Sequence, residues 1–353
     1  MTEELPDEAY AVGLAMSPKI RPAALRGLFE EYTPREAWER TAADGTRTAA
    51  DLAECWRHLR VHGITVLMPN HASYPQRLVD DPTAPPVLFC KGSPGVLNSV
   101  PTVALVGTRA PTRYGVGVAA QLGADLSAAG VSIVSGLALG IDGAAHEGAC
   151  GAGAPPIGVV AGGLDDPYPR RHARLWSRVS GHGAIISESP ARTPTERWRL
   201  PVRNRLLAAM SDAVVVVESR HSGGSRHTVE AALATGKPVG AVPGSIRSVA
   251  SEGTNALLAD GAFVVSSAGD VLVALGLRGI DPPIARRRSP SAAVAKPAPG
   301  EETRVYDALT ADPTSLDELV RLTHLDFPAL CGALERLARD GLARDVGGWW
   351  ERA

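Results

Sequence analysis

Hydrophobic positions divide the chain into three stretches with different periodicities. Between residues 8 and 63, apolar side chains such as Leu25 and Leu28 recur at near-helical intervals. From Val103 onward, short β-branched runs alternate with segments long enough for helices. After residue 302 the helical spacing returns. The pattern predicts an N-terminal helical region, a central α/β domain and a C-terminal helical unit.

The N-terminal region, residues 1–65, is predicted to be a small helical domain. Prolines mark the expected helix starts, since a proline fits the first turn of a helix: Pro18, Pro22 and Pro34. Two short apolar runs follow at 64–68 and 87–90, separated by loop residues. We assign 66–100 as a lead-in segment to the central domain.

The central domain, residues 66–278, carries seven short apolar runs. They span 103–107, 131–136, 157–163, 184–188, 214–218, 239–244 and, more weakly, 262–266. Runs that are apolar at nearly every position are typical of strands covered on both faces, as in a parallel sheet. Strands alternating with helices predict βαβ units. The expected fold is therefore α/β, with a Rossmann-like, doubly wound and mostly parallel sheet.

Residues 279–301 are rich in Pro, Ala, Arg and Ser, and they lack periodicity, which predicts a flexible linker. The rest of the chain, 302–353, predicts three short helices at 303–309, 315–322 and 327–340. A hairpin-like tail follows, with Gly347 and Gly348 at its tip. Three helices and a terminal hairpin are typical of a winged helix.

Charge and cysteine content restrict the function. The 353 residues carry a net charge of −2, so any nucleic-acid binding must come from a local basic patch. The four cysteines stand far apart without a Cys-x-x-Cys pair, which argues against structural zinc and disulfides. The acidic N-terminus lacks the pattern of a signal peptide, and no apolar stretch approaches the ~20 residues of a membrane helix. We expect a cytoplasmic protein without membrane insertion or a metal.

Small and polar residues follow most of the predicted strands. In a doubly wound sheet, ligands bind at the carboxyl ends of the strands, where backbone N–H groups can hold phosphate oxygens. The residues near these strand ends include Gly107, Thr108, Arg109, Ser135, Gly136, Arg203, Asn204, Arg205, Gly224 and Ser225. A single glycine turn is explained by backbone conformation alone. Because several such turns converge on one edge, the sequence favours an anion-binding surface.

Two common nucleotide motifs do not fit. A dinucleotide fingerprint at Gly115 begins eight positions after Gly107 and should follow directly, and Ser135-Gly136 offers no acid for a ribose. The Gly236-Lys237 pair lacks the upstream glycine of a phosphate loop. The sequence therefore predicts neither NAD nor a nucleoside triphosphate, and we expect no cofactor.

Nine arginines crowd residues 170–205, and part of this set is a solvated helix face. Arg203 and Arg205 flank Asn204 at an expected helix start, where phosphate binding is natural. Tyr168 and Trp198 either stack on bases or belong to the core.

A catalytic constellation is missing from the pattern. Asp142 and His146 stand four apart on a predicted helix, but no third metal ligand lies near them in the sequence. Packing or capping explains both residues. We therefore expect a binding protein and not an enzyme.

Seven segments resemble the DprA/Smf family when taken in order: VALVGTRAPTRYG, SGLALGIDGAAH, GGLDDPYP, IISESP, LPVRNRLLAAMSD, VVVVE with SGGSRHT, and AVPG with GTNALLADGA. The N-terminal helices resemble the family's sterile-alpha-motif-like domain. The resemblance implies a homodimer that coats incoming single-stranded DNA and helps load RecA during natural transformation. It places phosphate and base contacts at the ten candidate residues named above.

Two departures from the family pattern affect individual contacts. Leu139 stands where the family often has arginine, which removes one candidate phosphate contact. Arg226 and His227 stand where apolar residues usually precede Thr228, and they either supply a compensating charge or alter the pocket.

Two other function classes compete with this interpretation. Rossmann-like nucleoside-monophosphate phosphoribohydrolases carry a glycine motif that Gly223-Gly224, Thr228 and Glu230 echo with different spacing. Such small hydrolases lack the flanking domains. A transcription factor would read DNA with the third helix of the winged helix, but that helix has no basic excess.

Overall fold

The computed structural model describes residues 5–17, 19–20, 22–41, 48–277, 300–310, 314–345 and 348–352. The chain divides into two compact units, residues 1–285 and 286–353. Most of the predicted linker, including residues 279–299, lies outside the described residues. Among the described helices, none has the length and apolar character that crossing a bilayer would require.

Four helices open the first unit: α1 (Asp7–Ala15), α2 (Pro22–Glu31), α3 (Pro34–Thr41) and α4 (Ala49–Val61). Pro22 and Pro34 begin α2 and α3, as the sequence predicts, whereas Pro18 lies outside the described residues. Thr48 and Asp51 form a capping box that satisfies backbone N–H groups at the start of α4. The helical region is thus confirmed, and α4 has a well-defined first turn.

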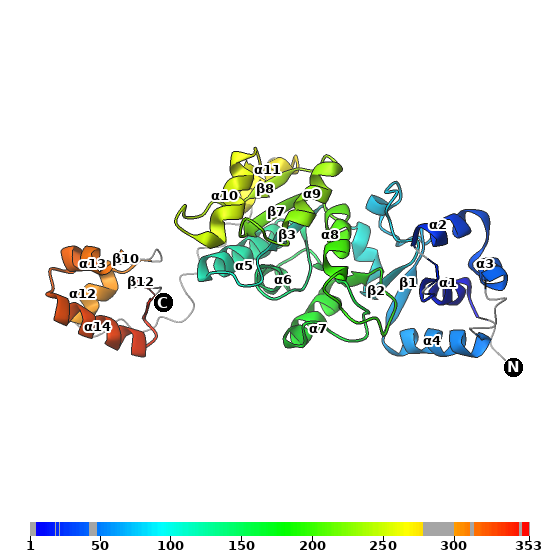
Figure 1. Cartoon of the computed structure of the whole chain (residues 1–353), viewed down its shortest axis with the longest axis horizontal. Helices are drawn as coiled ribbons and strands as arrows, with labels where there is room; N and C mark the ends of the chain where they lie inside the picture. Colours follow the sequence, from blue (N-terminus) through cyan, green and yellow to red (C-terminus); the bar gives the residue numbers. More distant parts are fainter. Residues whose placement is uncertain are drawn as a thin grey trace. The chain divides into compact units, whose positions relative to one another are not determined.

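Nine strands form one sheet in the order β1-β2-β6-β5-β4-β3-β7-β8-β9, of which Figure 1 labels β1, β2, β3, β7 and β8. Their bounds are β1 (Ile64–Leu67), β2 (Leu88–Gly92), β3 (Thr102–Gly107), β4 (Ser132–Ser135), β5 (Ile157–Val159), β6 (Ala184–Ser187), β7 (Ala213–Glu218), β8 (Val239–Ala241) and β9 (Phe263–Val264). The seven strands β6, β5, β4, β3, β7, β8 and β9, which are neighbours in this order, are parallel. Strand β2 pairs antiparallel with β6 and with β1. The mostly parallel, doubly wound sheet is confirmed.

Helices cover both faces of this sheet. They are α5 (Arg113–Ala128), α6 (Ile141–Ala149), α7 (Ala173–His182), α8 (Arg199–Ala209), α9 (Arg226–Ala234), α10 (Glu252–Ala259) and α11 (Ala268–Ala274). Short 3-10 turns lie at η2 (Gln76–Leu78), η3 (Pro94–Asn98), η4 (Arg170–His172) and η5 (Val249–Ser251). Leu105 packs in one core with α5, α6 and α11, while its neighbours Ala104 and Val106 pack in another with α8 and α9. This alternation explains why the central strands are apolar at every position.

The N-terminal helices share a core with one edge of the sheet. Leu14 and Leu59 pack in the same cluster as Trp176 of α7 and Ile185 of β6. In Figure 1, α1 and α4 flank β1 at that edge. The helical region and the sheet therefore belong to one compact unit.

The second unit is a small winged helix with α12 (Glu301–Ala308), α13 (Leu316–Thr323) and α14 (Phe327–Arg339). Strands β10 (Thr314–Ser315), β11 (Ala343–Asp345) and β12 (Trp349–Arg352) form an antiparallel sheet in the order β10-β12-β11. Val305, Leu319 and Leu334 lie in its core. The three helices and the tail are confirmed, and β10 adds a strand that was not predicted. Gly347 lies outside the described residues.

Candidate functional site

A cavity of about 140 Å³ lies at the carboxyl ends of β3, β4 and β5. It is lined by Arg109, Gly136, Ala138, Leu139, Val160, Ala161, Tyr168, Pro169, Thr195, Leu200 and Arg203. The loops after β3, β4, β5 and β6 supply most of these residues, and helix α8 supplies the last two. The cavity thus sits where an open α/β sheet binds its ligands.

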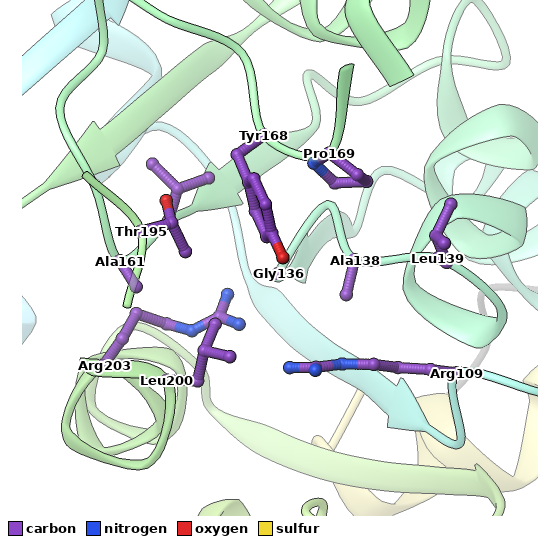
Figure 2. Close-up of a pocket in the computed structure, with 11 residues that line it drawn as sticks. Arg109, Gly136, Ala138, Leu139, Ala161, Tyr168, Pro169, Thr195, Leu200 and Arg203 are labelled. Carbon is purple, nitrogen blue, oxygen red and sulfur yellow. The ribbon is translucent and has the colours of Figure 1, made fainter. Parts of the chain in front are cut away.

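Two arginines point into this cavity from opposite sides. Figure 2 shows the guanidinium groups of Arg109 and Arg203 directed toward one another across it. Arg203 is only 4% exposed, and it donates a hydrogen bond to the Val159 carbonyl. Arg109 is exposed, and its side chain makes no hydrogen bond or ion pair with the residues that the structure describes. Two cations therefore face one small space.

The carboxylate of Asp142 acts as a partial counter-ion for these two arginines. It lies at the start of α6, and its Oδ2 accepts a hydrogen bond from the Gly136 N–H at 3.1 Å. Burial raises the pKa of Asp142, and attraction to Arg203 and, less strongly, Arg109 opposes that rise. A Cβ on Gly136 would lie within 2.6 Å of the Arg203 guanidinium and the Asp142 carboxylate, so a larger residue here would displace these side chains.

The pKa of Arg203 reflects its burial and the charges of Asp142 and Arg109. Burial lowers the pKa of Arg203 to about 10, Asp142 opposes this, and repulsion from Arg109 adds to it. The Nε atom of Arg203 is buried and has no hydrogen-bond partner within the described part of the chain. One carboxylate against two guanidinium groups leaves positive charge, and a bound anion would relieve the repulsion.

The predicted helix start at 203–205 is wrong, because α8 begins at Arg199 and places these residues in its middle. Successive side chains of a helix point in directions about 100° apart, so the three residues have different surroundings. Asn204 Nδ2 donates to the Gly224 carbonyl at 3.1 Å. Arg205 pairs with Glu188 and donates to the Thr83 carbonyl at 2.8 Å. Only Arg203 lines the cavity.

Three candidates around β3 and β4 hold the backbone and do not line the cavity. Ser135 is fully buried, and its hydroxyl donates to the Leu105 carbonyl at 2.6 Å. Thr108 donates its N–H to the Glu218 carbonyl at 2.8 Å. A Cβ on Gly107 would lie 2.6 Å from that same Glu218 carbonyl oxygen. Ser135 thus joins β4 to β3, while Thr108 and Gly107 let β3 and β7 approach closely at the strand ends.

The polar residues beyond β7 satisfy one another. The hydroxyls of Ser219 and Ser225 are 2.9 Å apart, and both residues are buried. Gly224 is exposed and accepts the hydrogen bond from Asn204. Arg226 pairs with Glu230, its neighbour one turn along α9, at 2.9 Å. His227 lies 3.6 Å from the same carboxylate. This group is separate from the cavity.

Glu218 fills the helix end at which a Rossmann dinucleotide would place its phosphates. Its carboxylate accepts hydrogen bonds from the Thr112 N–H at 2.8 Å and the Thr112 hydroxyl at 2.7 Å. Thr112 is the N-cap of α5, and a Cβ on Gly115 would lie 2.5 Å from Glu218 Oε2. The glycine at 115 therefore makes room for the protein's own carboxylate.

Asp142 and His146, which stand four apart on α6, have different surroundings: Asp142 accepts the hydrogen bond from Gly136. His146 is completely buried, and burial lowers its pKa to about 4. Throughout the described ranges, no group of three or more His, Cys, Asp or Glu residues could hold a metal ion.

Sequence reasoning missed the wall of the cavity formed by the loops after β5 and β6. Thr195 of that wall was not singled out, nor was Leu200 of α8, and Tyr168, 53% exposed, was left between two roles. The signal available was the position of Thr195 after the IISESP segment that ends β6. Residues beyond a strand end can fold back over the same edge of the sheet.

Comparison with known proteins agrees with this architecture. The profile of the family described as DNA recombination-mediator protein A matches residues 65–276, and that of the DprA winged helix domain matches residues 289–348. DNA processing protein DprA of Bacillus subtilis is 34% identical over 262 residues, which cover 74% of this chain and 83% of that protein. A putative DNA processing protein DprA of Mycobacterium tuberculosis is 39% identical over 274 residues, covering 76% and 68%.

Two solved structures are also similar. The X-ray structure of DprA from Streptococcus pneumoniae gives a TM-score of 0.63 at 28% identity, covering 77% of this chain and 98% of that one. A structure of DprA from Helicobacter pylori, reported for its single-stranded-DNA binding mode, gives 0.54 at 29% identity, covering 60% and 95%. With both domains matched and the fold shared, the chain belongs to the DprA/Smf family of DNA-processing proteins.

Proposed function

We propose that the protein binds single-stranded DNA at the cavity between β3, β5 and α8, and that it acts in DNA processing during natural transformation. The observation that carries the proposal is the pair formed by Arg109 and Arg203, two guanidinium groups that face one small cavity and are both attracted to one carboxylate, Asp142. A phosphate would accept hydrogen bonds from both and cancel their repulsion. The single-stranded-DNA binding mode of the Helicobacter pylori relative supports this ligand.

A single strand suits this site better than a duplex. The cavity is small and lies at the ends of strands, so the backbone must bend to bring one phosphate into it. A flexible strand can do so, and its unpaired bases can stack on exposed aromatic rings. Tyr168 lines the cavity and Trp198, 59% exposed, precedes α8. Binding through the backbone and stacking predicts little sequence preference.

The ten candidate residues have unequal parts in this proposal. Arg109, Gly136 and Arg203 would contact or shape the phosphate site directly. Gly107, Thr108 and Ser135 would hold the strand ends, while Asn204, Arg205, Gly224 and Ser225 would act through the packing of α8 and α9.

The remaining parts of the proposal rest on family membership. We propose that the protein acts in the cytosol as a homodimer, that it protects incoming single strands and that it helps to load RecA. It would do this by binding and not by catalysis.

The test measures binding of labelled oligothymidylate and of a labelled duplex by fluorescence anisotropy over a series of salt concentrations. We expect tighter binding to the single strand, with log Kd rising steeply with log salt, because each phosphate contact releases counterions. Incubation with nucleoside monophosphates tests the hydrolase alternative through release of free base. Equal or tighter binding to the duplex, or base release, would contradict the proposal.

A further inference from the structure

One wall of the cavity is built from two loops that are locked together. Residues 160–169 follow β5, and residues 188–198 follow β6. The Gly163 N–H donates to the Thr193 carbonyl at 2.9 Å, and the Ser189 hydroxyl donates to the Ala161 carbonyl at 2.8 Å. A Cβ on Gly162 would collide with Thr195. Hydrogen bonds therefore join the two loops that carry Tyr168 and Thr195 into one wall.

Asp165 is the centre of this lock. Both of its carboxylate oxygens accept from the Arg192 N–H at 3.0 Å. Burial raises the pKa of Asp165, but the hydrogen bonds from Arg192 and His58 outweigh it and leave that pKa below its usual value. Arg192 has a φ of +63°, a left-handed conformation that costs a non-glycine residue free energy. The bonds to Asp165 hold the backbone in this turn.

The N-terminal helices reach this lock through His58. His58 Nε2 lies 3.0 Å from Asp165 Oδ2, and the two side chains are 21% and 11% exposed. Glu54, one turn earlier on α4, pairs with the Arg192 guanidinium at 3.2 Å, but both side chains are more than half exposed. An exposed pair of this kind contributes little. The shielded His58–Asp165 contact is the stronger polar link between α4 and the wall.

We propose that His58 is a positioning residue for the DNA site: through Asp165 it holds the wall that carries Tyr168 and Thr195 in the conformation that binds a single strand. The N-terminal helices would then set the affinity of a site that they do not touch. This inference rests on the proposed function of the cavity. It assigns the N-terminal region a part in DNA binding, with α4 as the element that acts.

The test compares His58→Ala, His58→Gln and Arg60→Ala in the oligothymidylate assay. We expect His58→Ala to weaken binding about three- to tenfold, the range for residues that act through an intermediate contact. His58→Gln keeps an N–H donor near the same place and should restore most of the affinity. Arg60 is exposed on the same helix, and Arg60→Ala controls for loss of a side chain from α4.

Two further measurements separate positioning from other roles. Because His58 does not reach the phosphate, the slope of log Kd against log salt should stay unchanged, whereas Arg109→Ala should reduce it by about one. The loss from His58→Ala should also shrink in a Tyr168→Ala background, since both changes disturb one wall.

Any one of three results would overturn the proposal. The first is a His58→Ala variant that melts at a lower temperature but binds with unchanged affinity. The second is a reduced salt slope, which would mean that His58 contacts DNA directly. The third is a loss as large in Arg60→Ala. If Arg109→Ala leaves binding unchanged, the proposed function fails instead, so the two failures are distinguishable.

Discussion

Two groups of polar residues at the carboxyl edge of the sheet look alike in sequence and differ in what surrounds them. Around β3, β4 and β5, the guanidinium groups of Arg109 and Arg203 face a cavity, and Asp142 attracts both. Beyond β7, the hydroxyls of Ser219 and Ser225 pair with each other. The first group has an excess of positive charge that an anion could neutralise. The polar side chains of the second group already form hydrogen bonds within the protein.

Whether a polar residue can bind a ligand or only stabilises the fold depends on the partners that it already has inside the protein, and not on its residue type. A polar group whose hydrogen bonds are satisfied inside the protein has little to offer a ligand, and breaking its contact costs free energy of folding. A cation that lacks a matching anion gains from binding one. Predictions for the first group therefore concern affinity, and predictions for the second concern stability.

Arg203→Met should give the largest effect. Removing a buried cation leaves Asp142 without its stronger partner, which should cost about 3–5 kcal/mol of unfolding free energy. Loss of a charge from the cavity should also weaken oligothymidylate binding about a hundredfold or more. Urea denaturation and anisotropy measure the two losses. Near-normal affinity in the folded variant would place the phosphate elsewhere.

The same variant has a pH dependence of defined sign. The pKa of Asp142 is already raised by burial, and loss of the attraction from Arg203 should raise it further. An acid with a raised pKa in the folded state contributes stability at low pH that is lost as pH rises through that value. The deficit of Arg203→Met relative to the unchanged protein should thus be smaller at acidic than at neutral pH. A deficit independent of pH would mean that Asp142 is not its source.

Arg109→Ala should weaken single-strand binding about ten- to a hundredfold, since a charge-assisted contact contributes about 1.5–3 kcal/mol. The melting temperature should not fall, because the side chain is exposed, makes no hydrogen bond or ion pair in the described structure, and repels Arg203. Arg109→Lys should restore only part of the affinity, since the planar fork is lost. A lower melting temperature with unchanged affinity would make Arg109 a structural brace.

Deletion of residues 290–353 tests the second unit. The winged helix has its own core, and Arg336 of α14 pairs with Glu301 and Glu302 of α12. We expect the truncated protein to keep its single-strand affinity within about tenfold, or roughly 1.4 kcal/mol. A folded truncation that no longer binds would identify the winged helix as the DNA-binding module.

Ser225→Ala should give the smallest change in binding. It removes a buried hydroxyl pair with Ser219, which should cost about 1 kcal/mol of unfolding free energy. Affinity for oligothymidylate should stay within about threefold, or roughly 0.7 kcal/mol. A loss comparable to that of Arg109→Ala would extend the binding site across β7 and remove the contrast between the two groups.

The amino-acid sequence by itself determined the architecture, and it pointed to the edge of the sheet at which we propose that DNA binds. Apolar runs with flanking helices define a parallel sheet because a strand buried on both faces must be apolar throughout. Glycines, serines and arginines after those runs indicate the proposed binding edge, because the carboxyl ends of parallel strands meet there. The positions of Arg109 and Gly136 directly after β3 and β4 are enough to predict that both residues lie at this edge.

Only the tertiary structure decided which polar residues have partners. Arg203 and Arg205 are two positions apart on α8, yet one lines the cavity and the other pairs with Glu188, because a helix turns them to different neighbours. The contact of His58 with Asp165 joins residues that are 107 positions apart. The local sequence pattern predicts whether a residue is polar or buried. Which charged groups become its neighbours depends on the distant segments that the fold brings together.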